Sequence, residues 1–480
     1  MKDKLTNKRT IRGIEKYFKF DKLEAIFKKE LIAGISTFLS IIYILSVQPS
    51  LIVTNPIGHS FSDGKDAYYL GTFFATVLVS AFFSILMGLF ANVPITIIAS
   101  MGMTGLFINI AYTSAQPLYF EGAMMATMIS SILFFTISIT PLRSYVIKAI
   151  PESLTKVFGI GIGLFIAYVG LKNMGWFSLN NGMPVASLSK FKENYLGIIL
   201  GMLTLMIILG LYYNNVTGAA AIGIVIMFIV ALIIANTISE DNSSFNLIAN
   251  ANLRGGIHWD YNYLFGIKNN MSHVFSRMKD KSVWTNPTFY ISIFIITLIN
   301  FFDATGTMMV FNDKLNRQTK FKREISKKAL IVDAGGTMMA PLFGTTPMTT
   351  AVESSVGIEQ GGKTGVVSIV SGLLILSCLA IAPIFQMMPK CVTSASCVFV
   401  GILMLNESKY VAWDKPENLI AGFFSISFMV MTFSISNGIS LAIIFYTFIM
   451  IVTRKFKEIS ITMYLLSALF ILYFVITAFI

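Results

Sequence analysis

Apolar runs of about 20 residues recur along this chain and constrain its fold more than any other feature. A helix needs roughly 20 consecutive apolar residues to cross the ~30 Å hydrocarbon core of a bilayer. Hydrophobic residues make up 55% of the 480 residues, and charged residues only 12%. The pattern predicts an all-α polytopic membrane protein embedded in a lipid bilayer.

The apolar runs divide into two sets of seven predicted spans. The first set comprises 31–53, 70–90, 94–111, 122–141, 153–172, 195–213 and 217–238. The second set comprises 288–311, 327–342, 345–357, 364–386, 391–406, 418–434 and 436–453. The third and tenth spans are short and broken by proline, glycine and hydroxyl residues. A last apolar run, 459–480, is either a further span or a helix lying against the membrane.

A weak internal repeat supports this division. The segments that begin at Ile150 and Met388 share three residues in register, namely Pro151 with Pro389, Thr155 with Thr393, and Gly163 with Gly401. Because seven is odd, the second copy would be inverted relative to the first, as is common in secondary transporters. We therefore expect fourteen spans in a 7+7 inverted repeat, with chance similarity between apolar segments as the alternative.

Basic residues are concentrated in a few connections between the apolar runs. The first 30 residues hold ten Lys or Arg against five Asp or Glu, and the whole chain has a net charge of +12. When the N-terminus is placed in the cytoplasm, the most basic connections all fall on the cytoplasmic side, as the positive-inside rule requires. The charge thus predicts topology in a plasma membrane rather than a nucleic-acid partner, and it places the Asn-rich segment 239–287 outside.

The cysteines and histidines give no sign of a metal centre or cofactor. The cysteines all lie in apolar runs, which argues against a disulfide framework or a metal site; they are Cys378, Cys391 and Cys397. The histidines all lie in polar connections, which argues against a buried proton relay; they are His59, His258 and His273. We expect neither a metal nor a cofactor.

Three acids lie deep within the apolar runs: Asp303, Asp333 and Glu353. A charge at mid-bilayer costs roughly 2.5–3.5 kcal/mol on insertion scales, so each acid must face protein, water or a ligand. Their own short stretches contain no Lys or Arg, so we expect no direct ion pair. We assign a functional role to Asp303 and Glu353, and a structural role to Asp333.

The two broken spans are predicted to form half-helices that start inside the membrane. In "FGTTPMTTAVESSVG", Thr346 can cap a helix whose first residue is Pro347. Such a helix would place four residues on one face: Thr350, Glu353, Ser354 and Gly357. The third span, "VPITIIASMGMTGLFIN", has matching small and polar residues, so both helix N-termini would point at a common site. The alternative for Glu353 is a capping box with Thr350.

Polar stripes follow two other predicted spans. One stripe comprises Asn300, Asp303 and Thr307, and the other comprises Ser36, Ser40 and Tyr43. The first favours a wall of the site, because an acid is costlier to bury than a hydroxyl. The second is more typical of hydrogen bonding between helices.

Several motifs together resemble the azaguanine-type purine permeases of the nucleobase–cation symporters. They include "ELIAGISTFLSIIYILSVQPSLI", "FGIGIGLFIAYVGLKNMG", "NFFDATGT" and "VDAGGTMMAPLFGTTPMTTAVESSVGIEQGGKTG". The resemblance implies a uracil-permease-like fold with a core domain, spans 1–4 and 8–11, and a gate domain, spans 5–7 and 12–14. The expected boundaries are an N-terminal arm with an interfacial helix (1–30), core (31–142), gate (143–238), outer loop (239–287), core (288–387), gate (388–453) and a C-terminal segment (454–480).

The resemblance also implies a function and site residues. It implies uptake of adenine, guanine or hypoxanthine coupled to protons rather than Na⁺, by elevator-type movement of the core against the gate, in a protein that is not an enzyme and can form homodimers. Glu353 matches the family's substrate-binding glutamate, and Asp303 matches its eighth-span acid. Where such permeases carry "GMGLNA" in the third span, this chain has "SMGMTGLFIN", with Thr104 and Gly105 near the position of the asparagine.

The chemistry of a purine fits these residues. Its edge carries N–H donors, and one carboxylate can accept two of them, with the Thr350 hydroxyl nearby. Phe302 is expected to stack on the ring, with Phe107 and Phe301 as alternatives. Asp303 and Glu353 are the candidates for proton coupling, because burial disfavours a charged carboxylate. The competing functions are an anion transporter of sulfate type, which would need a basic residue at its site, and a channel or sensor without coupled transport.

Overall fold

The structure is a computed structural model. It describes residues 13–478 except 14, 53–64, 109, 112–117, 142, 144–148, 181–182, 187–190, 215, 217–218, 238–266, 269–270, 273, 276–280, 320–322, 382–387 and 433–434. Most of the predicted outer loop 239–287, the first twelve residues of the N-terminal arm, and the three histidines lie outside the described residues.

Helices make up most of the described chain. They are α2 (Phe20–Leu23), α3 (Phe27–Ile52), α4 (Lys65–Leu86), η1 (Met87–Ala91), α5 (Met101–Ile108), α6 (Tyr119–Ile139), α8 (Glu152–Asn173), α9 (Phe191–Tyr213), α10 (Ala219–Thr237), α13 (Lys281–Thr285), α14 (Pro287–Gln318), α15 (Lys327–Leu342), α16 (Ser354–Glu359), α17 (Gly365–Ser377), α19 (Lys390–Leu405), η4 (Asn406–Tyr410), α20 (Pro416–Met431), α21 (Ile435–Val452), η5 (Phe456–Glu458) and α22 (Ile461–Ala478). The strands are β1 (Ile97–Ala99), β2 (Phe177–Asn180), β3 (Met183–Ala186) and β4 (Met348–Thr350).

Among the described residues, six helical stretches are long and apolar enough to cross a membrane, and five shorter helices are also apolar. At 1.5 Å per residue, the 26 residues of α3 extend about 39 Å, more than a hydrocarbon core requires. The predicted helical membrane architecture is therefore confirmed.

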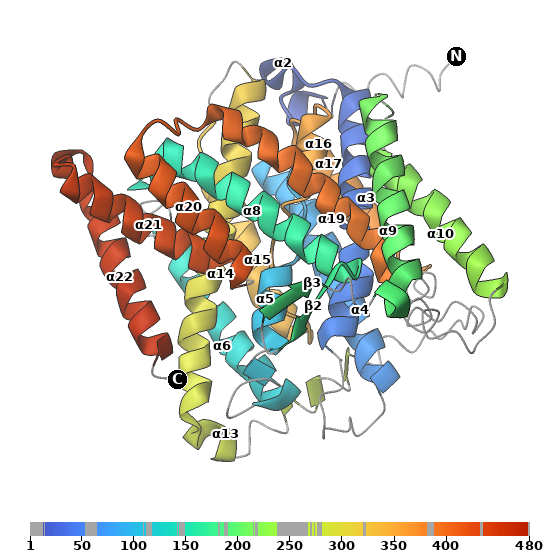
Figure 1. The fold of residues 1–480 in the computed structure, drawn as a ribbon, viewed down its shortest axis with the longest axis horizontal. Coiled ribbons are helices and arrows are strands. Elements are labelled where there is room, and N and C mark those ends of the chain that lie inside the picture. Colours follow the sequence, from blue (N-terminus) through green and yellow to red (C-terminus); the bar gives the residue numbers. More distant parts are fainter. Residues whose placement is uncertain are drawn as a thin grey trace.

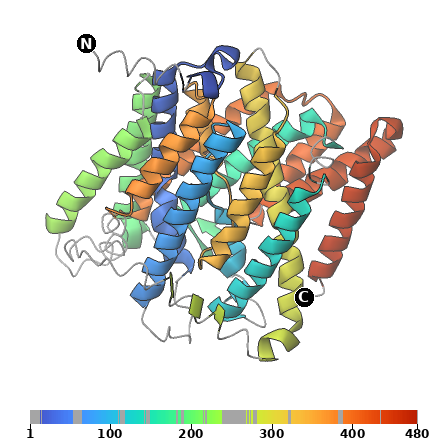
Figure 2. The same cartoon turned by 180° about the vertical axis from the view of Figure 1, so that it is seen from behind.

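The helices form two layers (Figure 1). The first layer is a row in which α3, α17, α4, α15, α6 and α14 pack in that order, as the view from behind shows for the dark-blue, orange, blue, gold and teal helices (Figure 2). The second layer is a row of α10, α9, α19, α8, α20, α21 and α22. Contacts of α3 with α19 and of α14 with α8 join the layers.

Corresponding helices of the two halves make corresponding contacts. In the first layer α3 packs on α17 as α14 packs on α6, and α4 packs on α17 as α15 packs on α6. In the second layer α9 packs on α19 as α20 packs on α8. In each comparison, the two helices of one contact correspond to the two helices of the other contact, and corresponding helices lie seven predicted spans apart.

Helices α8 and α19 approach closely at two glycines of the weak sequence repeat. A Cβ atom on Gly401 would lie 2.6 Å from the carbonyl oxygen of Gly163, which is closer than real Cβ contacts allow. Both helices begin after a proline in extended conformation, Pro151 for α8 and Pro389 for α19. The residues that the repeat aligned thus start the two helices and let them approach.

A buried carboxylate fixes the start of α17. Glu30 accepts hydrogen bonds from the backbone N–H groups of Lys363 (2.8 Å) and Thr364 (3.1 Å) and from the Thr364 hydroxyl (2.7 Å). An anion at a helix N-terminus satisfies N–H groups that lack helical partners. Arg323 donates to the carbonyl of Lys363 (3.0 Å), so the N-terminal segment, the basic connection that carries Arg323 and the connection 361–364 meet at one end of the molecule.

The last apolar run forms α22, which packs on α21. Tyr473 donates to Asn437 (2.9 Å), and Ser467 donates to Thr447 (2.9 Å). The opposite face carries exposed apolar side chains, including Ile461 at 79% and Leu465 at 66% exposure. An apolar helix face of this kind suits contact with lipid.

Candidate functional site

Two short strands cross where the third and tenth spans are broken. β1 pairs antiparallel with β4, and Ile97, Ile98 and Ala99 face Thr350, Thr349 and Met348 in turn. The β-branched residues on both strands favour extended backbone. Within the hydrocarbon core of a bilayer little or no water is available, so the two strands must satisfy each other's backbone groups.

This crossing corrects the predicted start of the tenth-span half-helix. The helix does not begin at Pro347, because residues 348–350 are extended and α16 starts only at Ser354. Pairing with β1 competes successfully with the local proline signal. Thr350 and Glu353 therefore do not share a helix face with Ser354 and Gly357.

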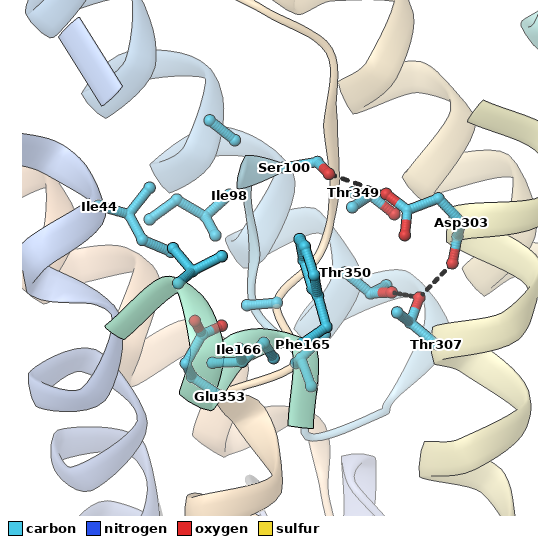
Figure 3. A pocket seen from close by; sticks show the side chains of 14 residues that line it. Ile44, Ile98, Ser100, Phe165, Ile166, Asp303, Thr307, Thr349, Thr350 and Glu353 are labelled. Atoms are coloured by element: carbon cyan, nitrogen blue, oxygen red, sulfur yellow. Dashed lines mark hydrogen bonds between the residues drawn. The ribbon is translucent and has the colours of Figure 1, made fainter. Parts of the chain in front are cut away.

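A cavity lies beside the crossing. Its lining comes from α3, β1, α8, α14 and the segment from β4 to α16: Ile44, Ile98, Ala99, Ser100, Phe165, Ile166, Val169, Asp303, Thr307, Thr349, Thr350, Ala351, Val352 and Glu353. In Figure 3, Glu353 and Asp303 stand on opposite sides, with the Phe165 ring between them. Mostly apolar walls with a few convergent polar groups are typical of small-molecule sites.

Asp303 lies in α14 and is buried, with 3% of its surface exposed. Ser100 Oγ donates a hydrogen bond of 2.8 Å to its Oδ2 atom. Within the described residues Oδ1 has no hydrogen-bond partner. A buried carboxylate oxygen without a donor is costly, so this atom is suited to receive a proton or a ligand N–H group.

The predicted stripe on α14 faces the site in part. Thr307 donates to the backbone carbonyl of Asp303 (2.9 Å), and its hydroxyl lies 2.7 Å from that of Thr350 on β4. These bonds hold β4 against α14 (Figure 3). Asn300 is buried one turn away but is not among the residues that line the cavity.

Glu353 is the residue immediately before α16, and its side chain lines the cavity. Thr350 lies in β4 and the helix begins only at Ser354, so Thr350 and Glu353 do not form the predicted capping box at a helix start. Glu353 is 5% exposed. Its carboxylate stands at the N-terminal end of a helix, where the dipole favours negative charge.

Thr104 of the third span makes hydrogen bonds next to the cavity. Thr104 donates to the Ser100 carbonyl (2.9 Å), and its hydroxyl lies 3.0 Å from that of Thr346. Gln48 donates to Thr346 (2.9 Å) and to Thr345 (2.6 Å), which extends this network to α3. Thr104 does not line the cavity. Its hydroxyl connects α5 to the segment that leads into β4.

Of the remaining predicted residues, Gly105 lies in α5, and its surroundings lie outside the described residues. Phe302 lies in α14, but its side chain lies outside the described residues. Phe107 packs edge-on against Phe120, with ring centroids 5.9 Å apart. Among the described lining residues the aromatic side chain is Phe165 of α8, which the sequence did not single out.

Asp333 has an ion-pair partner, contrary to expectation. Arg143 Nη2 lies 2.8 Å from Asp333 Oδ2, and both side chains are fully buried. The guanidinium also donates to Thr305 (3.2 Å) and to the Leu330 carbonyl (3.1 Å). The partner lies 190 residues upstream, so the short stretch around Asp333 could not show it.

The stripe on α3 is also structural in part, since Ser36 donates to Gln360 (2.6 Å).

The described lining of the cavity carries acidic groups, and the nearby Arg143 is paired with Asp333. Among its described lining residues are two carboxylates and no Lys, Arg or His. Arg143 is buried against Asp333 and lies outside the lining. The site therefore offers hydrogen-bond acceptors and hydroxyl groups, which suit a ligand that carries N–H donors.

Solved structures of transporters share this fold. The transmembrane domain of the cyanobacterial bicarbonate transporter BicA matches with a TM-score of 0.56 at 15% identity, over 86% of this chain and 97% of that chain. SLC26A9 matches with a TM-score of 0.53 at 14% identity, over 94% of this chain and 70% of that chain. The fold is that of a multi-pass membrane transporter.

The chain belongs to the Permease family, whose model matches residues 28–441. The guanine/hypoxanthine permease PbuG of Bacillus subtilis is 29% identical over 96% of this chain and 99% of its own length. The adenine permease AdeP of Escherichia coli is 29% identical over 96% of this chain and 95% of its own length. The resemblance inferred from the motifs is confirmed, and the chain is a transporter rather than an enzyme.

Proposed function

We propose that this permease imports purine nucleobases, such as adenine, guanine or hypoxanthine, together with protons across the plasma membrane. The observation that carries the proposal is the position of Glu353 and Asp303 on opposite sides of one cavity, beside the crossing of β1 and β4. The names of the related permeases PbuG and AdeP support the same substrate class.

The cavity can hold a purine by its edge and its face. Glu353 accepts N–H groups from the purine edge, since one carboxylate can accept two parallel donors. Phe165 packs against the ring, as aromatic side chains do in nucleobase sites. The Ser100 and Thr350 hydroxyls also line the cavity, and the Ser100 oxygen, whose hydrogen is donated to Asp303, can accept a hydrogen bond from the ligand.

We assign the coupling of uptake to protons to Asp303. Glu353 contributes to coupling by binding the substrate. Burial disfavours the charged form of Asp303, and its Oδ1 atom has no hydrogen-bond partner within the described residues. A proton on this oxygen would remove the cost of the buried charge. We assign coupling to H⁺ rather than Na⁺ on this ground.

Movement of the first layer against the second would carry the substrate across. The cavity lies between the layers, with Ile44 and Asp303 on one side and Phe165 on the other. We assign the first layer to the core domain (31–142 and 288–387) and the second to the gate domain (143–238 and 388–453). The matching contacts of helices seven spans apart support a 7+7 inverted repeat, the usual basis of alternating access.

The basic segments support a cytoplasmic N-terminus. Lys363 donates to the carbonyl of Glu24 (3.4 Å), and Arg323 donates to the carbonyl of Lys363 (3.0 Å). The basic N-terminal arm and the basic connection that carries Arg323 therefore meet at one end, through Lys363. The positive-inside rule assigns that end to the cytoplasm.

Transport by the purified protein in lipid vesicles tests the proposal. With an acidic exterior, labelled hypoxanthine should accumulate inside, and unlabelled adenine, guanine, xanthine and uracil rank the substrate preference by competition. Glu353→Gln should lower uptake at least ~100-fold, because the site loses a charged acceptor. Glu152→Gln is the matched control, since that side chain is 73% exposed on α8.

Uptake by Glu353→Gln that equals uptake by the parent protein would contradict the proposed role of Glu353. Exchange of bicarbonate or sulfate without nucleobase uptake would instead favour the anion transporter. Flux that is linear in substrate concentration and insensitive to the pH gradient would favour a channel.

A further inference from the structure

A second hollow lies in the same interface between the layers. One wall comes from α3 and the end of α16, and the other from α9, α10 and α19. Ser36 lines this hollow, whereas Ile44 of the same helix lines the central cavity. Eight residues correspond to about 12 Å along a helix, so the two hollows follow one another along α3.

The second hollow lies toward the end of the molecule where the basic segments gather. Gln360 lines it and directly precedes the connection 361–364, which Glu30 and Arg323 bind. Under the proposed topology this is the cytoplasmic end. A substrate that leaves Glu353 for the cytoplasm along this interface would reach the second hollow next.

The gate-side wall offers an aromatic surface. Tyr212 of α9 and Phe399 of α19 meet edge to face, with ring centroids 5.1 Å apart and an interplanar angle of 71°. Both residues line the hollow, and Phe399 is 2% exposed. Aromatic side chains bind nucleobases by stacking regardless of base identity, which suits a weak, transiently occupied site rather than a selective one.

The core-side wall offers polar groups with a fixed orientation. Ser36 Oγ donates to Gln360 Oε1 at 2.6 Å, which holds the amide group at the wall. Glu359 accepts from Lys314 of α14 at 2.8 Å, so its charge is balanced within the first layer. An amide group has both donors and an acceptor, as the edge of a purine does.

We propose that this hollow is a second, weaker nucleobase site, occupied on the cytoplasmic side after the substrate leaves Glu353. The proposal rests on the proposed function. Its two walls belong to the two layers, so the site is complete only when the layers adopt the arrangement seen here. The first site selects the purine, and the second holds it during release.

Equilibrium binding of labelled hypoxanthine to the purified protein tests this directly. Glu353→Gln should abolish tight binding and leave one weak site per chain. Adding Tyr212→Ala to Glu353→Gln should weaken the remaining binding about tenfold or more, because a stacking partner is lost. Adding Tyr213→Ala should leave it unchanged, since Tyr213 is the adjacent residue, 75% exposed and absent from the lining.

Blocking the hollow provides an independent test in vesicles. Ala220→Trp fills it from α10, and uptake should fall at least ~10-fold while tight binding that depends on Glu353 persists. Val225→Trp is the matched control on the same helix, since Val225 is 50% exposed and is not among the residues that line the hollow.

Two results separate this proposal from the proposed function. Complete loss of binding in Glu353→Gln, together with equal uptake by Ala220→Trp and Val225→Trp, would overturn the second site and leave the first intact. Absence of any nucleobase binding by the parent protein would overturn both.

Discussion

Ser100 donates a 2.8 Å hydrogen bond to Asp303, which joins the residue between β1 and α5 to the middle of α14. Ser100 is also tied to the other broken span, because its backbone N–H donates to the carbonyl of Pro347 (3.3 Å). One residue thus links both interrupted segments and the acid that we assign to coupling. Its substitution should change transport more than its small size suggests.

Ser100→Ala should lower uptake about 10- to 100-fold at limiting substrate. The variant removes a hydrogen bond to a carboxylate, worth about 1.5–3 kcal/mol, in a site where water cannot replace it. Ser100→Thr keeps the hydroxyl and should retain most activity. Initial uptake rates in vesicles, normalised to the amount of folded protein, measure the difference. Equal loss in both variants would show that the hydroxyl is not the cause.

Arg143→Met should destabilise the protein by about 3–5 kcal/mol, because it leaves the fully buried Asp333 without its partner. The double variant Arg143→Met/Asp333→Asn removes both charges and should recover most of that loss. Thermal unfolding in detergent, followed for the two single variants and the double variant, measures the coupling. Additive losses would contradict a structural ion pair.

Gly365→Ala should destabilise the first layer strongly. A Cβ atom there would collide with the backbone of Gly88 in η1, and backbone cannot move aside as a flexible side chain can. Gly210→Ala is the matched control in α9, where nothing lies within 4 Å of an added Cβ. That variant should be neutral or more stable by up to about 1 kcal/mol, since alanine favours helix. Similar melting temperatures for both variants would contradict the predicted close approach.

Much of the fold could be predicted from local sequence. Apolar run length predicted the helices, and proline and glycine predicted the two breaks, because both signals act within about 20 residues. The aligned Gly163 and Gly401 indicated a repeat, and they meet between α8 and α19.

Pairings between distant segments could not be predicted in this way. The three-residue strands β1 and β4 lie about 250 residues apart, and each is too short to leave a periodic pattern. The same holds for Arg143 and Asp333. Phe165 was missed because a phenylalanine in a glycine-rich apolar helix has no local signal that separates a cavity wall from lipid contact.

The account depends most on the separate roles of the two acids across one cavity. Proton-driven accumulation and substrate exchange without a gradient, measured on the same vesicles, test Asp303→Asn most directly. We predict that this variant exchanges labelled hypoxanthine across the membrane but no longer accumulates it when the exterior is acidic. Undiminished pH-driven accumulation by Asp303→Asn would contradict the account and assign coupling to another group.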